Sequence, residues 1–87
     1  MKKVEAGEIY CHFKGHYYYV ICVGLDSETR ERVVVYQHLD GTKEICTRSE
    51  KMFLEEIPER PDNVTGQKYR FELVKNMDAE VTKYDRY

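Results

Sequence analysis

The chain has 87 residues and a formal net charge of −2, with 14 Lys and Arg against 16 Asp and Glu. This length predicts one domain, and the absence of a basic excess argues against a protein that chiefly binds nucleic-acid backbones. The three cysteines are odd in number and far apart, which disfavours a disulfide framework: they are Cys11, Cys22 and Cys46. The first residues, MKKVEAGE, lack the apolar stretch of a signal peptide, and no run approaches a membrane span, so we expect a cytoplasmic location without membrane contact.

The first part of the chain predicts a β-hairpin. Residues 8–13 (EIYCHF) alternate between apolar and polar or amphipathic side chains, as a strand does. Residues 17–24 (YYYVICVG) are rich in aromatic and β-branched side chains, which favour a second strand. Lys14-Gly15-His16 between them is typical of a turn.

The length of the hairpin loop decides which side chains face the core. A two-residue loop pairs odd positions of the first strand with even positions of the second. The expected core face then comprises Ile9, Cys11, Phe13, Tyr18, Val20 and Cys22. The expected opposite face, partly exposed and aromatic, comprises Tyr10, His12, Tyr17, Tyr19 and Ile21. A three-residue loop would invert the second strand.

Further strands are predicted along the rest of the chain. After a polar connection at 26–31, residues 32–39 and 43–47 form strands around the hairpin turn Asp40-Gly41. A polar turn at 48–51 precedes a fifth strand at 53–57, which Pro58 ends. Residues 58–66 form a loop, and residues 68–74 alternate again, which indicates a last strand.

Five or six short antiparallel strands without a helix of ordinary length predict an all-β protein. At this size the most economical fold is a small SH3-like barrel or roll, with an OB-type barrel as the alternative. We expect an N-terminal lead-in at residues 1–6 and a single domain at 7–74. Residues 75–87 are predicted to be a polar, loose tail.

The order of several short motifs is similar to that of a known family. These motifs are His12-Phe13-Lys14-Gly15, Tyr19, Val20, Ser27-Glu28-Thr29, Val34-Val35-Tyr36, Leu39, Gly41, Arg48, Met52-Phe53 and Glu55. In this order the chain resembles the bacterial domain-of-unknown-function family 1653 over about residues 7–57, with 69–71 matching its closing segment. It departs from the family pattern at Cys46, where Trp is usual, and at Ser49, where Pro is usual. The resemblance implies an SH3-like β-barrel and no established activity.

Thiols and imidazoles suggest no metal site or enzyme. The possible soft ligands are Cys11, His12, His16, Cys22, His38 and Cys46, and none falls in the close pairs typical of zinc sites. We therefore expect no metal or cofactor. Cys46 near Arg48 is the best candidate nucleophile, with His12 or His38 as base, but nothing in the sequence brings them together. A thiol-dependent enzyme is thus kept only as a second alternative.

Aromatic and basic side chains form the preferred candidate site. These residues are Tyr10, His12, Lys14, Tyr17, Tyr19, Tyr36 and Arg48. Rings beside a guanidinium can hold a peptide or a flat or anionic ligand. We predict a non-catalytic binding module for a peptide or protein, with a nucleotide or single-stranded nucleic acid as the alternative ligand. The competing interpretation is that the tyrosines only stabilise a thin barrel.

The polar connection at 26–31 offers a smaller candidate. Glu28 could be presented to a partner, and Ser27 could cap a single helical turn. An ordinary connector with local capping is the favoured interpretation, because capping needs only these residue types.

Overall fold

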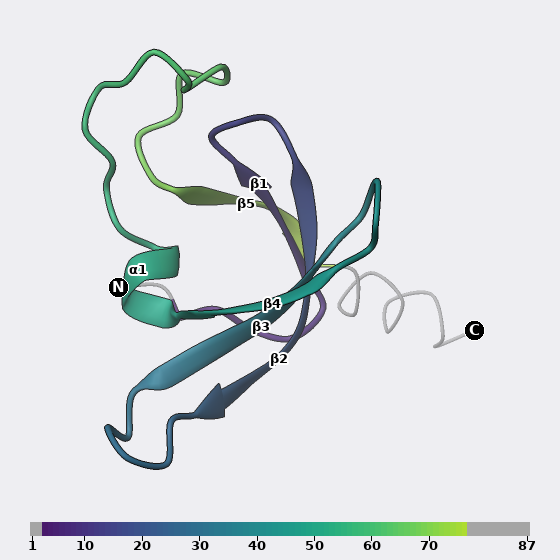
Figure 1. Cartoon of the computed structure of the whole chain (residues 1–87), viewed down its shortest axis with the longest axis vertical. Helices are drawn as coiled ribbons and strands as arrows, with labels where there is room; N and C mark the ends of the chain where they lie inside the picture. Colours follow the sequence, from purple (N-terminus) through teal and green to yellow (C-terminus); the bar gives the residue numbers. More distant parts are fainter. Residues whose placement is uncertain (1–2, 77–87) are drawn as a thin grey trace.

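The computed structural model describes residues 3–76, and within these it has five strands and one short helix. They are β1 (Glu8–His12), β2 (Tyr17–Leu25), β3 (Arg32–His38), β4 (Ile45–Ser49), α1 (Glu50–Phe53) and β5 (Phe71–Asn76). The strands form one antiparallel sheet in the order β4-β3-β2-β1-β5, with β4 and β5 at its edges (Figure 1). This sheet is open and roughly barrel-like. The predicted all-β class is confirmed, and the SH3-like classification stays a prediction.

The hairpin between β1 and β2 has a three-residue loop, so the two-residue prediction is wrong. Tyr10 pairs with Tyr18 and Cys11 with Tyr17, and the N–H of His12 donates to the carbonyl of His16 at 2.9 Å. The extra residue exchanges the faces of β2 relative to β1. Tyr10 is consequently buried in the core beside Tyr18, and not part of an exposed surface.

A β-bulge within β2 interrupts the alternation of inward and outward side chains along this strand. The register with β3 shifts between Val20 and Cys22. Because a bulge inserts one extra residue on one strand, Val20 and Val23 both pack on the core although they are three positions apart. Cys22 is exposed, so its predicted place in the core is wrong, and Cys11 is only partly buried. Of that predicted set, the other members are buried: Ile9, Phe13, Tyr18 and Val20.

The chain after β4 is helical where a fifth strand was predicted. Ser49 ends β4 and caps α1, because its hydroxyl accepts the N–H of Met52 at 3.2 Å. Phe53 is the last residue of α1, and from residues 53–57 only Glu56 forms an isolated bridge, with Tyr69. The predicted strand at 53–57 is therefore wrong. The predicted last strand corresponds to β5, which begins three residues later and reaches Asn76.

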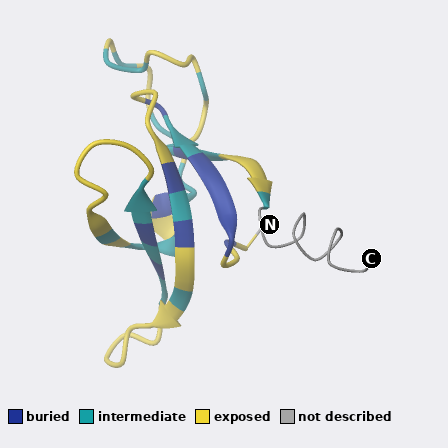
Figure 2. Ribbon diagram, turned by 90° about the vertical axis from the view of Figure 1, so that its right-hand side faces the viewer, coloured by how far each residue is buried: buried dark blue, intermediate teal, exposed yellow. Residues whose placement is uncertain are grey.

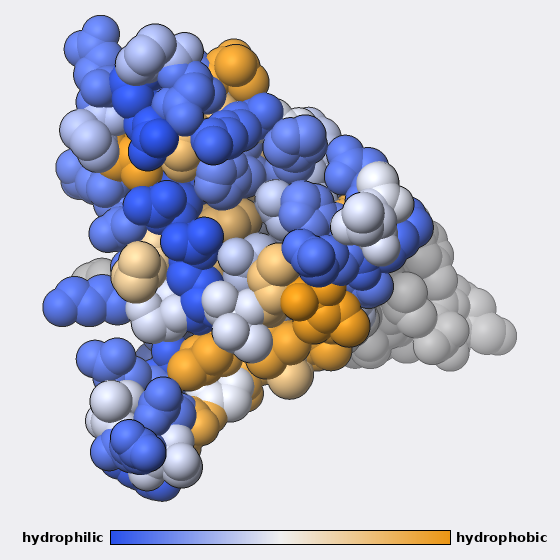
Figure 3. All heavy atoms as spheres, viewed as in Figure 1, coloured by the Kyte–Doolittle hydropathy of each residue, from blue (hydrophilic) through white to orange (hydrophobic). Residues whose placement is uncertain are grey.

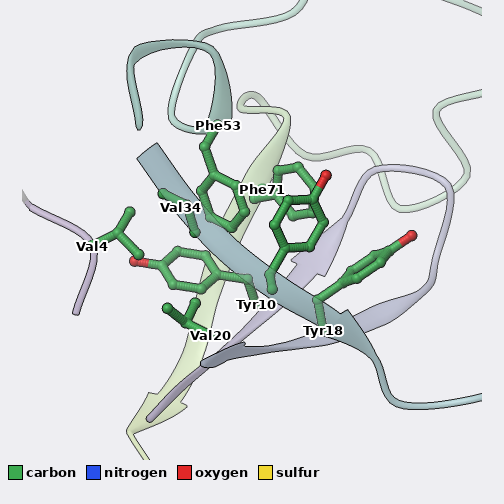
Figure 4. Close-up of a cluster of buried hydrophobic side chains, with 8 residues drawn as sticks. Val4, Tyr10, Tyr18, Val20, Val34, Phe53 and Phe71 are labelled. Atoms are coloured by element: carbon green, nitrogen blue, oxygen red, sulfur yellow. The ribbon is translucent and has the colours of Figure 1, made fainter. Parts of the chain in front are cut away.

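The core is a cluster of aromatic rings and valines between the strands and α1 (Figure 4). Phe53 and Phe71 stack with centroids 4.0 Å apart, and Tyr10 and Tyr36 meet Phe53 edge-on. Buried residues lie in β1, β2, β3 and at the start of β5, while most residues of the connecting loops are exposed or only partly buried (Figure 2).

The N-terminal segment contributes to this core. Val4 is fully buried, its N–H donates to the Glu50 carboxylate, and its carbonyl accepts from Arg32, each at 2.9 Å. The packed unit thus includes a residue of the predicted lead-in. Of the predicted tail, residues 77–87 lie outside the described part. Within residues 3–76 there is no helix with the length and apolar character that crossing a membrane requires.

Candidate binding site between the edge strands

The two edge strands, β4 and β5, approach each other without pairing, and side chains fill the space between them. We name the residues gathered there the seam cluster: His12, Tyr18, Tyr36, His38, Arg48 and Phe71. Five strands supply them, since β1 and β3 end on this side of the sheet and β2 and β5 begin there. Residues more than fifty positions apart in the chain therefore meet in one place.

Arg48 occupies the middle of the seam cluster. Its Cζ lies 5.9 Å from the centroid of the Phe71 ring on the opposite edge strand, and its Nε donates to the Tyr36 hydroxyl at 3.3 Å. Arg48 has no carboxylate partner anywhere in residues 3–76. A guanidinium carries five N–H donors, so residues 3–76 leave most of the hydrogen-bonding capacity of Arg48 unused.

His12 supplies a neutral donor beside Arg48. Its Nδ1 accepts the backbone N–H of Lys14 at 3.1 Å, which places the proton of the neutral ring on Nε2. Burial, together with the positive charges of Arg70, Arg48 and Lys14, lowers the pKa of His12 to about 4. The ring is thus uncharged at neutral pH. Its Nε2–H has no hydrogen-bond partner in the described residues.

Tyr18 and His38 form the polar end of the cluster. The Tyr18 hydroxyl lies 3.3 Å from Nε2 of His38, whose Nδ1 lies 3.7 Å from the Asp40 carboxylate. Burial raises the pKa of Tyr18, so its hydroxyl stays protonated at neutral pH. In Figure 4 this hydroxyl points away from the ring cluster, whereas that of Tyr10 points toward Val4. The hydroxyl of Tyr18 therefore lies at the edge of the packed aromatic core, beside His38.

Ion pairs neutralise other cations of the described residues, which lie outside the seam cluster. Arg70 binds Glu55 through Nη2 at 2.6 Å, and Lys14 and Arg60 share the carboxylate of Asp62. Among the arginines that the structure describes, Arg30 and Arg48 alone lack an acidic partner. Arg30 lies in the β2–β3 connection, which joins the opposite ends of these strands.

The structure brings together three of the seven predicted aromatic and basic site residues: His12, Tyr36 and Arg48. Tyr10 is instead buried, and its hydroxyl donates to the Glu8 carboxylate at 2.9 Å. Lys14 stands at the hairpin turn, half exposed and paired with Asp62.

The predicted continuous face does not exist, because its members lie on two sides of the sheet. Tyr17 and Tyr19 pair with Cys11 and Ile9, one position out of phase with the inward Tyr10 and Tyr18. The predicted set lacked three members of the seam cluster: Tyr18, His38 and Phe71. The assumed loop length had assigned Tyr18 to the opposite face. The alternative three-residue loop would have placed Tyr18 on the same face as His12.

The connection at 26–31 is a local turn built on a different residue from the one predicted. Asp26 accepts the backbone N–H groups of Glu28 and Thr29 at 2.9 and 3.0 Å, which lowers the pKa of its exposed carboxyl. Asp26, and not Ser27, thus supplies the cap, and Ser27 and Glu28 are both exposed.

The thiols do not assemble a nucleophile and a base. All three cysteines are free, and no hydrogen bond joins Cys46 to a histidine within the described part of the chain. The Cys11 thiol donates to the carbonyl of His12 at 3.4 Å, and burial raises its pKa. Across residues 3–76, no group of three or more His, Cys, Asp or Glu side chains is arranged to hold a metal ion.

Fold and site together define a small all-β domain with one open five-stranded sheet, whose edges are bridged by an arginine among aromatic rings. Residues 8–73 match the model of the family described as "Protein of unknown function (DUF1653)", and the chain belongs to this family. The resemblance inferred from the sequence motifs is confirmed. No curated protein and no solved structure matches the chain.

Proposed function

We propose that this protein is a non-catalytic binding module that holds a peptide segment of a partner protein at the seam cluster. The observation that supports it is a pair of donors, on Arg48 and His12, that have no partner in residues 3–76. The Phe71 ring, the Tyr36 hydroxyl and the backbone of Lys14 fix these two side chains in position. Donor groups held rigidly before a ligand arrives lose little conformational freedom on binding, which favours affinity.

The packing of the rings favours a peptide over a nucleobase. Tyr18, Tyr36 and Phe71 are only 8%, 4% and 2% exposed, because they pack against one another edge-on at 5.3–5.4 Å. A base needs an open ring face on which to stack, and these faces are covered. The groups left at the rim are N–H and O–H groups, which suit the polar groups of a peptide. A nucleotide remains the alternative ligand that the experiment below tests.

We propose that the module is not an enzyme because no cysteine in the described residues has a histidine base bonded to it. A cysteine nucleophile requires a base within hydrogen-bond reach, and Cys46 lies in β4 without a bonded histidine in the described residues. The three free cysteines also support a reducing, cytoplasmic setting for the module and its partner.

Amide and side-chain NMR titrations test the proposed function. The protein is titrated separately with acidic, basic and proline-rich peptides, with adenosine monophosphate and with a single-stranded oligonucleotide. We expect saturable shifts centred on His12, Tyr18 and Arg48 with at least one peptide class. Arg48→Gln should abolish them, and the matched control Arg30→Gln, which removes the other arginine without an acidic partner, should not.

Three results would overturn the proposal. Silence with every peptide, saturable shifts that centre on another surface, or a response to nucleic-acid ligands alone would each contradict a peptide-binding module at this site. The folded state of each variant is checked by the dispersion of its amide spectrum, and Arg48→Lys provides a second substitution that retains the charge.

A further inference from the structure

We propose that the group recognised by the seam cluster is a single carboxylate, held between the guanidinium of Arg48 and the Nε2–H of His12. The carboxylate can come from the C-terminus of the peptide or from an Asp or Glu side chain. This inference rests on the proposed function and names the chemistry by which the peptide is anchored.

Arg48 has the geometry that a carboxylate requires. Its Nε–H is used by the Tyr36 hydroxyl, and the Phe71 ring lies beside the guanidinium, so the group has a restricted orientation. The two terminal nitrogens remain without a partner in the described residues. Their parallel N–H groups match the two oxygens of a carboxylate, and such charge-assisted pairs are roughly twice as strong as neutral hydrogen bonds.

The local charge favours one monoanion over a phosphate dianion. Arg70 is neutralised by Glu55 at 2.6 Å, and Asp62 lies between Lys14 and Arg60. Lys14 is half exposed, so water and salt screen its charge. Arg48 therefore contributes a positive charge that has no acidic partner in residues 3–76, which a carboxylate balances and a dianion exceeds.

His12 adds a donor without adding a second charge. The charged and titratable groups facing it are Arg70 before β5, Arg48 on β4, Lys14 and His16 in the hairpin, and the Tyr18 hydroxyl on β2. The cationic groups among them, Arg70, Arg48 and Lys14, each lower the pKa of His12 and so favour the neutral imidazole. A carboxylate bound next to the ring would offset these charges and raise the pKa of His12 from its value in the free protein.

Matched pairs of small probes separate the carboxylate from the rest of a peptide. Acetyl-glycyl-glycine is compared with its C-terminal amide, and acetyl-aspartate amide with acetyl-asparagine amide, by NMR titration of the whole chain. We expect each acid to bind at least about tenfold more tightly than its amide, the difference that a hydrogen bond to a charged group makes. The first pair reports a terminal carboxylate and the second a side-chain carboxylate.

Two further readouts locate the bound group. The pKa of His12, followed through its ring protons, should rise when the protein is saturated with an acid probe and stay constant with the amide. Arg48→Gln should reduce binding of the acid to the level of the amide, Arg48→Lys should fall between them, and Arg30→Gln should bind as the native protein does.

The outcomes distinguish this inference from the proposed function. If acid and amide probes bind equally, or if inorganic phosphate binds more tightly than either acid, the carboxylate assignment is wrong while the peptide module stands. An acid that binds without changing the pKa of His12 would also overturn the assignment. If none of the longer peptides binds at the seam cluster, the proposed function itself is wrong.

Discussion

Truncation of Phe53 is the most direct test of how α1 closes the core. The side chain is fully buried, stacks on Phe71 at 4.0 Å with an interplanar angle of 1°, and meets Tyr10 and Tyr36 edge-on. Removing a buried Phe side chain costs about 3–5 kcal/mol, because burial is lost and a cavity remains. At ~0.05–0.15 kcal/mol per residue, a domain of 87 residues is stable by about 4–13 kcal/mol. Phe53→Ala should therefore remove a large part of the free energy of unfolding.

Urea denaturation followed by far-ultraviolet circular dichroism measures this loss. The matched control is Met52→Ala on the same helical turn, where the side chain is 47% exposed and the expected change is within about 0.5 kcal/mol. Phe53→Leu, which keeps the burial and loses the ring contacts, should cost about 1–1.5 kcal/mol and covers the case in which the alanine variant is unfolded. A cost below about 0.5 kcal/mol for both Phe53 variants would refute the docking of α1 on the ring cluster.

Three further predictions concern the hairpin, a buried hydrogen bond and pH. Gly15→Ala should lower the free energy of unfolding by about 1–2 kcal/mol, because Gly15 has a φ of 92°, which a residue with a Cβ rarely adopts. The control Gly24→Ala should not lower it, because Gly24 has no positive φ and no atom near its Cβ position. Equal effects of the two variants in urea denaturation would contradict the conformation of the β1–β2 loop. Tyr10→Phe should cost about 1–3 kcal/mol by removing a donor to the buried Glu8 carboxylate, and a neutral result would refute that bond. The pKa of His12, about 4, lies below its ordinary 6.5, so the unfolded chain binds more protons between these values. The free energy of unfolding should therefore decrease as pH falls through this window. His12→Gln should lose this component, and a slope unchanged from the native protein would count against the lowered pKa.

Element types were largely predictable because period-two alternation and turn residues are local properties of the chain. The strands β1, β2 and β3 begin at the predicted residues and end within one residue of the predicted positions. Asp40-Gly41 was correctly placed between two strands, although β4 starts two residues later than expected. Motif order also identified the family, since it needs no knowledge of how the strands pair.

The sequence did not predict which side chains of β1 and β2 share a face. This depends on whether the loop between the two strands has an even or an odd number of residues. The three-residue loop between β1 and β2 places Tyr10, and not Cys11, on the same face as Tyr18. The bulge after Val20 then interrupts the alternation of β2, so that Cys22 faces outward although Tyr18 and Val20 face the core. Neither a loop length nor a bulge has a reliable signature in a single sequence.

The helix α1 was missed because a short apolar run does not distinguish a strand from a helical turn. Phe53, Leu54 and Ile57 satisfy both patterns over so few residues. The decisive feature is Ser49, whose hydroxyl accepts an N–H three residues later and starts the turn. The resulting position of Phe53 against Phe71 is a tertiary contact, which local propensity cannot supply.

The tyrosines were interpreted either as core residues or as a binding surface, and both interpretations apply to different parts of the same side chain: the ring packs in the core, and the hydroxyl forms polar contacts. Hydrophobic side chains also gather on the surface where β2 and β3 run (Figure 3), so exposed apolar area alone does not mark the site. What distinguishes the seam cluster is that Tyr18 and Tyr36 bury their rings and keep their hydroxyls beside His38 and Arg48. In a domain this small, the rings needed for stability also fix the donors needed for recognition. Ligand chemistry at this site should consequently follow the polar rim, which favours an anion, and not the ring faces, which are already occupied.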